Sequence, residues 1–72
     1  MDSKSYFQEK AQDVARVTPI YKVLEEKGPD HDKHFVVGVY LNDELVAKGE
    51  GNSKQEAQRE AAKNGLAIKG WV

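Results

Sequence analysis

The residues best suited to chemistry lie between Gly49 and Ala62. Ser53 and Glu56 have the S-x-x-E spacing of a capping box, in which each side chain can bond a free backbone N–H at the start of a helix. Lys54 would lie in the first turn of that helix, where the helix dipole and the free N–H groups already favour anions. A lysine beside exposed N–H groups suits a phosphate, so the sequence predicts a nucleic-acid partner.

The other reactive side chains form weaker groups. The chain has no cysteine and no serine–histidine–acid constellation that offers a nucleophile. His31 and His34 could ligate a metal together with Asp30 and Asp32, but ligating pairs normally need further convergent ligands. We therefore expect no catalytic residue, no metal site and no cofactor in this chain, and we expect the acids from Glu25 to Asp32 to be solvated.

Length and composition bound the remaining possibilities. A chain of 72 residues, 39% of them hydrophobic, predicts one small domain over residues 1–72. The net charge is −1, but the segment from Ser53 onward contains four basic and two acidic residues, a local surplus of two positive charges. No apolar run approaches the roughly 18 residues of a membrane span, and the absence of cysteine fits a reducing compartment, so we expect no membrane partner and a cytoplasmic location.

Hydrophobic periodicity predicts the elements that position these residues. Phe7, Ala11 and Val14 recur at helical spacing, which predicts a helix from Ser3 to about Val14 that is capped by Asp2 or Ser5. Thr18–Pro19 should end helical conformation, because the residue before a proline is pushed to extended geometry.

Three strands and a second helix follow. The expected strands are 20–26, 34–41 and 44–48, with a tight turn at Asn42–Asp43. In the second strand Phe35, Val37 and Val39 should face inward and Val36, Gly38 and Tyr40 outward; in the third, Leu45 should face the core together with Ala47 or Val46. Gly49 and Gly51 should break the third strand.

The last helix should begin near Ser53 and end at Gly70, with Gly65 weakening its last turn. Its stripe of small and apolar residues lets it lie close on a sheet, and Trp71 should cover the end of the core; the stripe comprises Ala57, Ala61, Ala62 and Leu66. The expected fold is α+β: α-β-β-β-α, a three-stranded antiparallel sheet with two helices packed on one face.

The string Phe35-x-Val37-x-Val39 … Gly49-x-Gly51-x-Ser53-Lys54-x-x-Ala57-x-x-x-Ala61-Ala62 resembles the double-stranded RNA-binding domain. The loop from Gly28 to His31 and the segment Phe7-Gln8-Glu9-x-x-Gln12 look most like the version at the C-terminus of bacterial ribonuclease III. The resemblance covers about Asp2 to Leu66 and implies recognition of double-stranded RNA by A-form shape, largely without regard to sequence.

The resemblance implies three contact regions. The first is the opening helix, where Gln8, Glu9 and Gln12 would meet ribose 2′-hydroxyls in a minor groove. The second is the loop, through Pro29, Asp30 and His31. The third is the start of the last helix, where Ser53, Lys54, Gln55 and Gln58 would meet phosphates.

This chain departs from the family pattern in the third region. Two further lysines are usual there, and this chain has Gln55 and Gln58 instead. Glutamine can donate a hydrogen bond to phosphate but releases no counterion, so we expect lower affinity and a shallower salt dependence.

The resemblance also implies a parent protein. Ribonuclease III cleaves double-stranded RNA with a separate magnesium-dependent domain whose acidic signature is absent here, so this chain would be the binding part of a homodimeric nuclease and would itself be a monomer without enzymatic activity. The alternative is a protein-interaction or dimerisation module of the same fold with weak RNA binding. The near-neutral charge and the two missing lysines favour that alternative.

Overall fold

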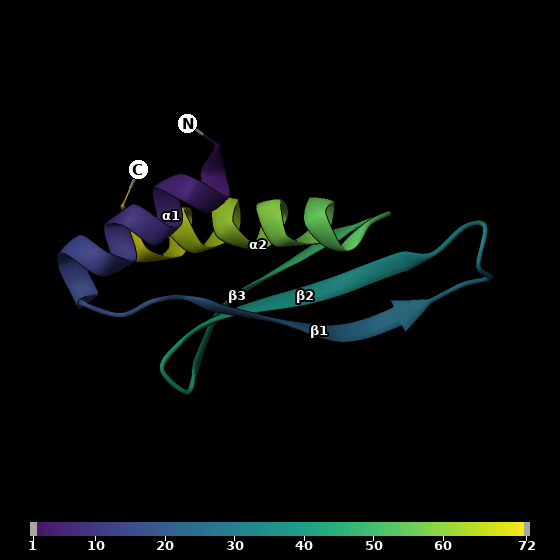
Figure 1. Ribbon diagram of the computed structural model, residues 1–72, viewed down its shortest axis with the longest axis horizontal. Coiled ribbons are helices and arrows are strands. Elements are labelled where there is room, and N and C mark those ends of the chain that lie inside the picture. Colours follow the sequence, from purple (N-terminus) through teal and green to yellow (C-terminus); the bar gives the residue numbers. More distant parts are fainter. Residues whose placement is uncertain (1, 72) are drawn as a thin grey trace.

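A computed structural model describes residues 2–71, so the expected domain bounds of 1–72 extend one residue beyond it at each end. The element order is α1 (Ser3–Lys10), η1 (Ala11–Ala15), β1 (Ile20–Lys27), β2 (His34–Leu41), β3 (Glu44–Gly51) and α2 (Lys54–Lys69). The three strands form one antiparallel sheet in the order β1-β2-β3. Both helices lie on the same face of that sheet (Figure 1), which confirms the expected α-β-β-β-α fold.

The first helix differs from the expectation in its second half. Asp2 caps it by accepting a hydrogen bond from the Ser5 N–H at 2.8 Å. From Ala11 the backbone widens into a π-helical turn, and Arg16 in the left-handed conformation (φ 60°) ends it. The wider turn takes Val14 off the face that carries Phe7 and Ala11. Val14 is therefore 60% exposed, and its expected place in the core is wrong.

The central strand β2 matches its expected bounds, and Phe35, Val37 and Val39 are buried as expected. Val36 is also buried although it faces away from the helices. Side chains from the neighbouring strands cover part of the outward face of β2. Leu24 of β1 and Leu45 of β3 both lean over Gly38, because a Cβ added there would lie 2.9 Å from Leu24 Cδ1 and 2.8 Å from Leu45 Cδ1.

The third strand continues through the glycines that were expected to break it. Gly49 pairs with Val37 and Gly51 pairs with Phe35. A register shift at Val39/Tyr40 alters the alternation, so that Val46 and Ala47 are both buried while Leu45 is 40% exposed. Leu45 therefore does not face the core, contrary to expectation.

The glycines in β3 have a packing role instead. A Cβ at Gly49 would lie 2.0 Å from the Ala61 nitrogen and 2.4 Å from the Ala57 carbonyl oxygen. The backbones of β3 and α2 are thus in direct contact, which only glycine on the strand and alanine on the helix permit.

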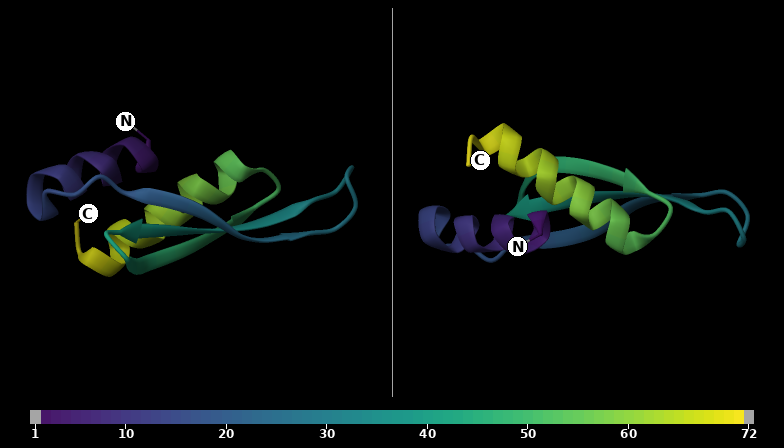
Figure 2. Two further views of the ribbon diagram at one scale, coloured as in Figure 1. Left: turned by 60° about the horizontal axis from the view of Figure 1, so that its bottom comes forward. Right: turned by 90° about the horizontal axis from the view of Figure 1, so that it is seen from above.

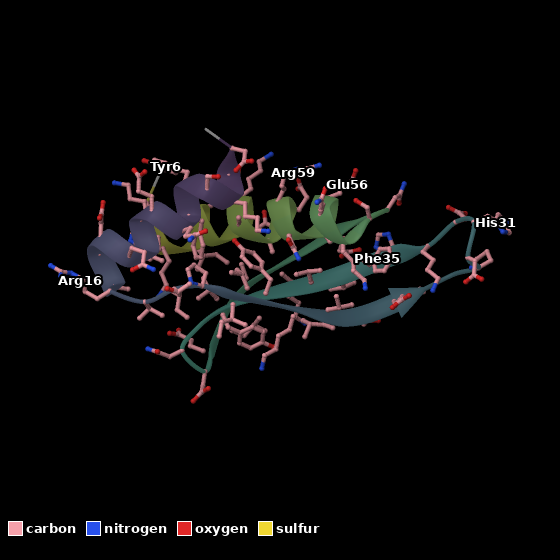
Figure 3. All side chains as sticks on the ribbon, in the orientation of Figure 1. Tyr6, Arg16, His31, Phe35, Glu56 and Arg59 are labelled. Carbon is pink, nitrogen blue, oxygen red and sulfur yellow. The ribbon has the colours of Figure 1, made fainter. Side chains whose placement is uncertain are left out.

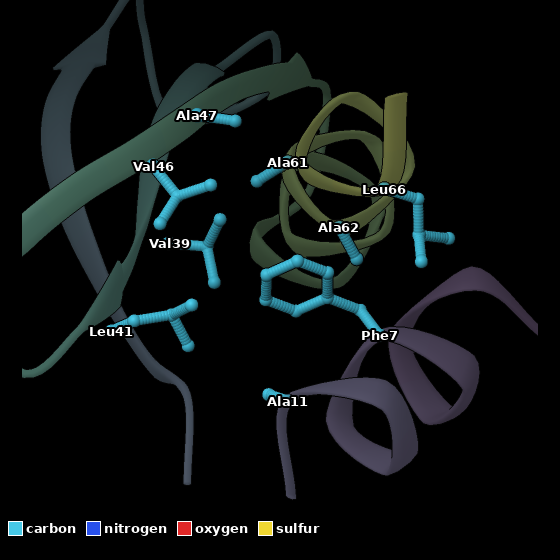
Figure 4. Packing of buried hydrophobic residues seen from close by; sticks show 9 residues of the cluster. All are labelled: Phe7, Ala11, Val39, Leu41, Val46, Ala47, Ala61, Ala62 and Leu66. Carbon is cyan, nitrogen blue, oxygen red and sulfur yellow. The ribbon is translucent and has the colours of Figure 1, made fainter. Parts of the chain in front are cut away.

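One main core joins the two helices to the sheet. The Phe7 ring lies between α2 and the strands (Figure 4) and is fully buried. Gly65 makes room for it, since a Cβ there would lie 2.9 Å from Phe7 Cε1. Trp71 packs against the same ring with a centroid separation of 5.4 Å, which confirms that it covers the end of the core.

Tyr21 on β1 packs against this main core and against a second, smaller cluster of Phe35, Val37 and Ala57, and burial raises the pKa of Tyr21 to about 12. An unfolded tyrosine titrates near pH 10, so above that pH the unfolded state loses its proton first. We therefore expect the contribution of Tyr21 to stability to be complete below about pH 10 and to be lost as pH rises toward about 12. Urea denaturation from pH 9 to 12 should show this loss in the wild type and less of it in Tyr21→Phe. Tyr40→Phe, on the opposite face of the sheet, is the matched control, and an identical alkaline loss in both variants would contradict the prediction.

Candidate nucleic-acid interface

The start of α2 is capped from two directions. Ser53 Oγ accepts a hydrogen bond from the Glu56 N–H at 3.1 Å, as expected. The Glu56 carboxylate accepts from the Asn52 N–H at 2.9 Å, one residue before the Ser53 N–H that the capping-box pattern predicts. Lys54 follows in the exposed first turn, with its ammonium 6.0 Å from the centroid of the Phe35 ring. The two caps therefore fix where the helix begins, and the Lys54 side chain places a positive charge at that point.

The loop between β1 and β2 extends beyond the helices at one end of the molecule (Figure 1). Gly28 adopts φ 92°, and the Asp32 N–H donates to the Pro29 carbonyl at 2.9 Å, which closes the turn. Lys33 Nζ lies 2.6 Å from Glu26 Oε1, and the hydrogen bond and charge of Lys33 lower the pKa of that carboxyl. These contacts shape the loop, whereas Pro29, Asp30 and His31 remain exposed at its tip.

The loop and the turn just before α2 border the same hollow. Its lining joins the loop to the end of β3 and comprises Asp30, His31, Asp32, Lys33, Phe35 and Asn52. Phe35 also lies beside the Lys54 ammonium. The second and third expected contact regions are therefore contiguous on the surface.

The first expected region lies on α1 and η1. Gln8 and Glu9 are exposed on α1. Gln12 lies within the π-helical turn and donates a hydrogen bond from its amide nitrogen to the Thr18 hydroxyl. Gln12 is thus oriented by its own loop, while Gln8 and Glu9 point freely into solvent.

A contact between the two helices links the first and third regions. Lys4 Nζ donates to Gln58 Oε1 at 2.7 Å. A second hollow surrounds this contact and is lined by Asp2, Lys4, Gln55, Gln58 and Arg59. Lys4 is a residue of this contact that sequence reasoning missed. Its partner is 54 positions away, and no local pattern signals the approach of α1 to α2.

The three regions follow one another along the molecule, whose longest extent is 40 Å. In Figure 3 the α1 residue Tyr6 lies toward one end, Arg59 and Glu56 of α2 lie in the middle, and His31 lies at the other end. Figure 2 shows the same order in two further views. Such a row of amides, a capped helix start and an imidazole can hydrogen-bond to sugars and phosphates at several points of a long polyanion.

The part of the chain that the structure describes offers neither a metal cluster nor a membrane-spanning helix. No cluster of three or more His, Cys, Asp or Glu side chains within residues 2–71 could hold a metal ion. None of the described helices is both long enough and apolar enough to cross a membrane.

Known proteins show similarity in both sequence and structure. The chain is 50% identical over 68 residues to "Ribonuclease 3" of Moorella thermoacetica and 48% identical over 61 residues to that of Natranaerobius thermophilus. These alignments cover 94% and 85% of this chain, but only 29% and 26% of the relatives. The chain therefore spans less than a third of the length of these curated relatives.

Two solved structures share the fold. A structure of Arabidopsis HYL1 superposes with a TM-score of 0.81 at 28% identity, covering 94% of this chain and 96% of that one. A structure of Dicer from Pichia stipitis gives a TM-score of 0.72 at 29% identity, covering 90% of this chain and 31% of that one. Residues 3–69 match the family described as "Double-stranded RNA binding motif", and this match, nearly the whole chain, establishes that the protein belongs to that family.

Proposed function

We propose that this domain binds double-stranded RNA by its A-form shape, through three surfaces that engage two minor grooves and the phosphates between them. The observation that carries the proposal is the order of α1, the start of α2 and the β1–β2 loop along one 40 Å axis. A domain of this family spans about 16 base pairs and contacts two successive minor grooves and the intervening phosphates. The order of the three surfaces supports that mode of binding.

Each surface has a chemistry suited to its part of the duplex. Gln8 and Glu9 on α1 would meet 2′-hydroxyls. Gln12 in η1, which uses one N–H on Thr18, would accept from a 2′-hydroxyl through its amide oxygen. Pro29, Asp30 and His31 would enter the next minor groove from the loop. The phosphates between would be bound by the start of α2, through Ser53, Lys54, Gln55 and Gln58.

Discrimination between RNA and DNA tests the minor-groove part of the proposal. Gel shifts with RNA and DNA duplexes of equal length and sequence should show tighter binding to RNA, because DNA lacks the 2′-hydroxyl. Equal affinities for the two duplexes would refute the role of the α1 and loop surfaces.

Lys54→Ala should weaken binding to all RNA duplexes alike, by about tenfold, because it removes one charge-assisted contact to phosphate. The slope of log affinity against log salt should become shallower by about one. Lys48→Ala is the matched control, because Lys48 pairs with Gly38 and lies on the sheet face opposite the helices. A loss confined to one RNA sequence, or an equal loss in the control, would contradict the assignment of Lys54.

The relatives suggest the setting of the domain. We propose that it is the substrate-binding part of a ribonuclease III-type endonuclease, with magnesium-dependent catalysis and dimerisation in the remainder of a cytoplasmic parent protein. The 50% identity to a bacterial "Ribonuclease 3" over 94% of this chain supports this. The isolated domain should be monomeric and should leave duplex RNA intact in the presence of Mg²⁺. Cleavage by the purified domain would contradict the proposal that catalysis lies in the remainder of the parent protein.

A second candidate function is self-association through the outer face of the sheet. Leu24, Leu45 and Ile20 are between 37% and 52% exposed there, on the face that the helices leave open. Light scattering without RNA separates the two candidates, since a stable dimer would favour self-association and a monomer that shifts RNA duplexes would favour the first proposal.

A further inference from the structure

The contact between α1 and α2 places a positive charge directly beside the neutral Gln58 of α2. Three α2 residues after Lys54 line the hollow: two neutral amides, Gln55 and Gln58, and one cation, Arg59. Lys4 reaches across from the first turn of α1 to within 2.7 Å of Gln58 Oε1. We propose that the hollow between α1 and α2 is a phosphate subsite in which Lys4 supplies the cation and orients Gln58. This inference rests on the proposed binding of duplex RNA.

The hydrogen bond fixes which end of the Gln58 amide faces outward. Its oxygen accepts from Lys4, so its amide nitrogen points away from Lys4. A phosphodiester offers only acceptors, and an amide that presents its two N–H groups suits it, whereas one that presents its oxygen would repel it. Lys4 thus acts as a positioning residue for Gln58 as well as a source of charge.

The ammonium of Lys4 is held in place on a second side. It lies 5.3 Å from the centroid of the Tyr21 ring, within the range of a cation–π contact. One N–H is used by Gln58, which leaves two donors on the ammonium. A cation restrained in this way loses little side-chain entropy when an anion arrives.

The net charge of the hollow favours an anion. Lys4 and Arg59 are opposed by a single carboxylate, that of Asp2. That carboxylate already accepts the Ser5 N–H, and this hydrogen bond lowers the pKa of Asp2. The hollow keeps a surplus of one positive charge, and Lys54 adds another cation one helical turn from Gln58.

The test compares Lys4→Met, which keeps the aliphatic stem and removes the charge, with Lys10→Met on the same helix. Lys10 is the matched control because its ammonium lies 5.7 Å from the Tyr6 ring, outside the hollow. Affinity for an RNA duplex is measured across a salt series, with a thermal melt of each variant. We expect Lys4→Met to lose about tenfold in affinity and about one unit of salt slope, and Lys10→Met to lose neither.

A rescue experiment distinguishes a role in binding from a role in folding. Adding Gln58→Lys to Lys4→Met returns a cation to the hollow and should restore both affinity and salt slope. A purely structural Lys4 would lower the melting temperature, leave the salt slope unchanged and not be rescued, and that result would overturn the subsite. Lys4→Gln, which keeps a donor without the charge, replaces the methionine variant if the latter melts below the assay temperature.

The two levels of the proposal fail in different ways. A wild-type domain that shifts RNA, with Lys4 and Lys10 variants that bind equally well, would overturn the subsite alone. A wild-type domain that shifts no RNA duplex at all would overturn the proposed function and the subsite with it.

Discussion

Gly49→Ala is expected to destabilise the protein severely. The new Cβ would lie 2.0 Å from the Ala61 nitrogen, 2.4 Å from the Ala57 oxygen and 2.6 Å from the Glu60 carbonyl carbon. All three atoms belong to the backbone of α2, so no side chain can turn aside and the helix itself must shift. Overpacking of a core costs about 1–3 kcal/mol where side chains can adjust, and we expect about 3 kcal/mol or more here. At about 0.05–0.15 kcal/mol per residue, a domain of 72 residues has only about 4–11 kcal/mol of stability, so this loss is a large fraction of it.

Urea denaturation followed by circular dichroism measures this effect. Lys48→Ala changes the neighbouring residue on the same strand, where the side chain is exposed, and should shift the midpoint little. A Gly49→Ala protein with the wild-type midpoint would show that β3 and α2 can separate without cost.

Phe7→Ala should have a comparable effect by the opposite mechanism, the creation of a cavity. The ring is fully buried at the centre of the core (Figure 4), and it also contacts Gly65 and Trp71. Truncation of a buried phenylalanine costs about 3–5 kcal/mol, because the lost burial adds to the free energy of the cavity. The free energy of unfolding from denaturant titration measures it directly.

Val14→Ala is the control for this prediction. The sequence pattern places Val14 on the same stripe as Phe7, but its side chain is 60% exposed beyond the π-helical turn. We expect its truncation to change stability by no more than about 0.5 kcal/mol. Equal losses for the two variants would mean that the first helix is regular in solution and buries Val14.

The sequence predicted the element order, the bounds of β2 and the buried stripe of α2, because these depend on local periodicity and on caps. It failed where tertiary contacts override a local rule. Gly49 and Gly51 are breakers by propensity, yet they continue β3 because the close approach of α2 requires them. The π-helical turn at Ala11 and the register shift at Val39/Tyr40 each move one apolar residue out of the core, and neither has a local signature.

In the candidate interface, too, some features could be predicted from the local sequence and others arise only from tertiary packing. The cap at Ser53 and the loop turn at Gly28 follow from residue types at short spacing. The adjacency of Phe35 to Lys54 and of Lys4 to Gln58 arises only after the helices pack on the sheet. The residue-level contacts with RNA stay predictions, which the variants of Lys54 and Lys4 test.

The direct backbone contact between β3 and α2 has a consequence for how the domain can diverge. Since no side chain separates the strand from the helix at Gly49, the height of α2 above the sheet is set by main-chain atoms alone. The position of the capped start of α2 relative to the protruding loop is therefore fixed. Substitution of exposed residues at the start of α2 or in the loop would change the affinity for RNA but leave the distance between these two surfaces unchanged.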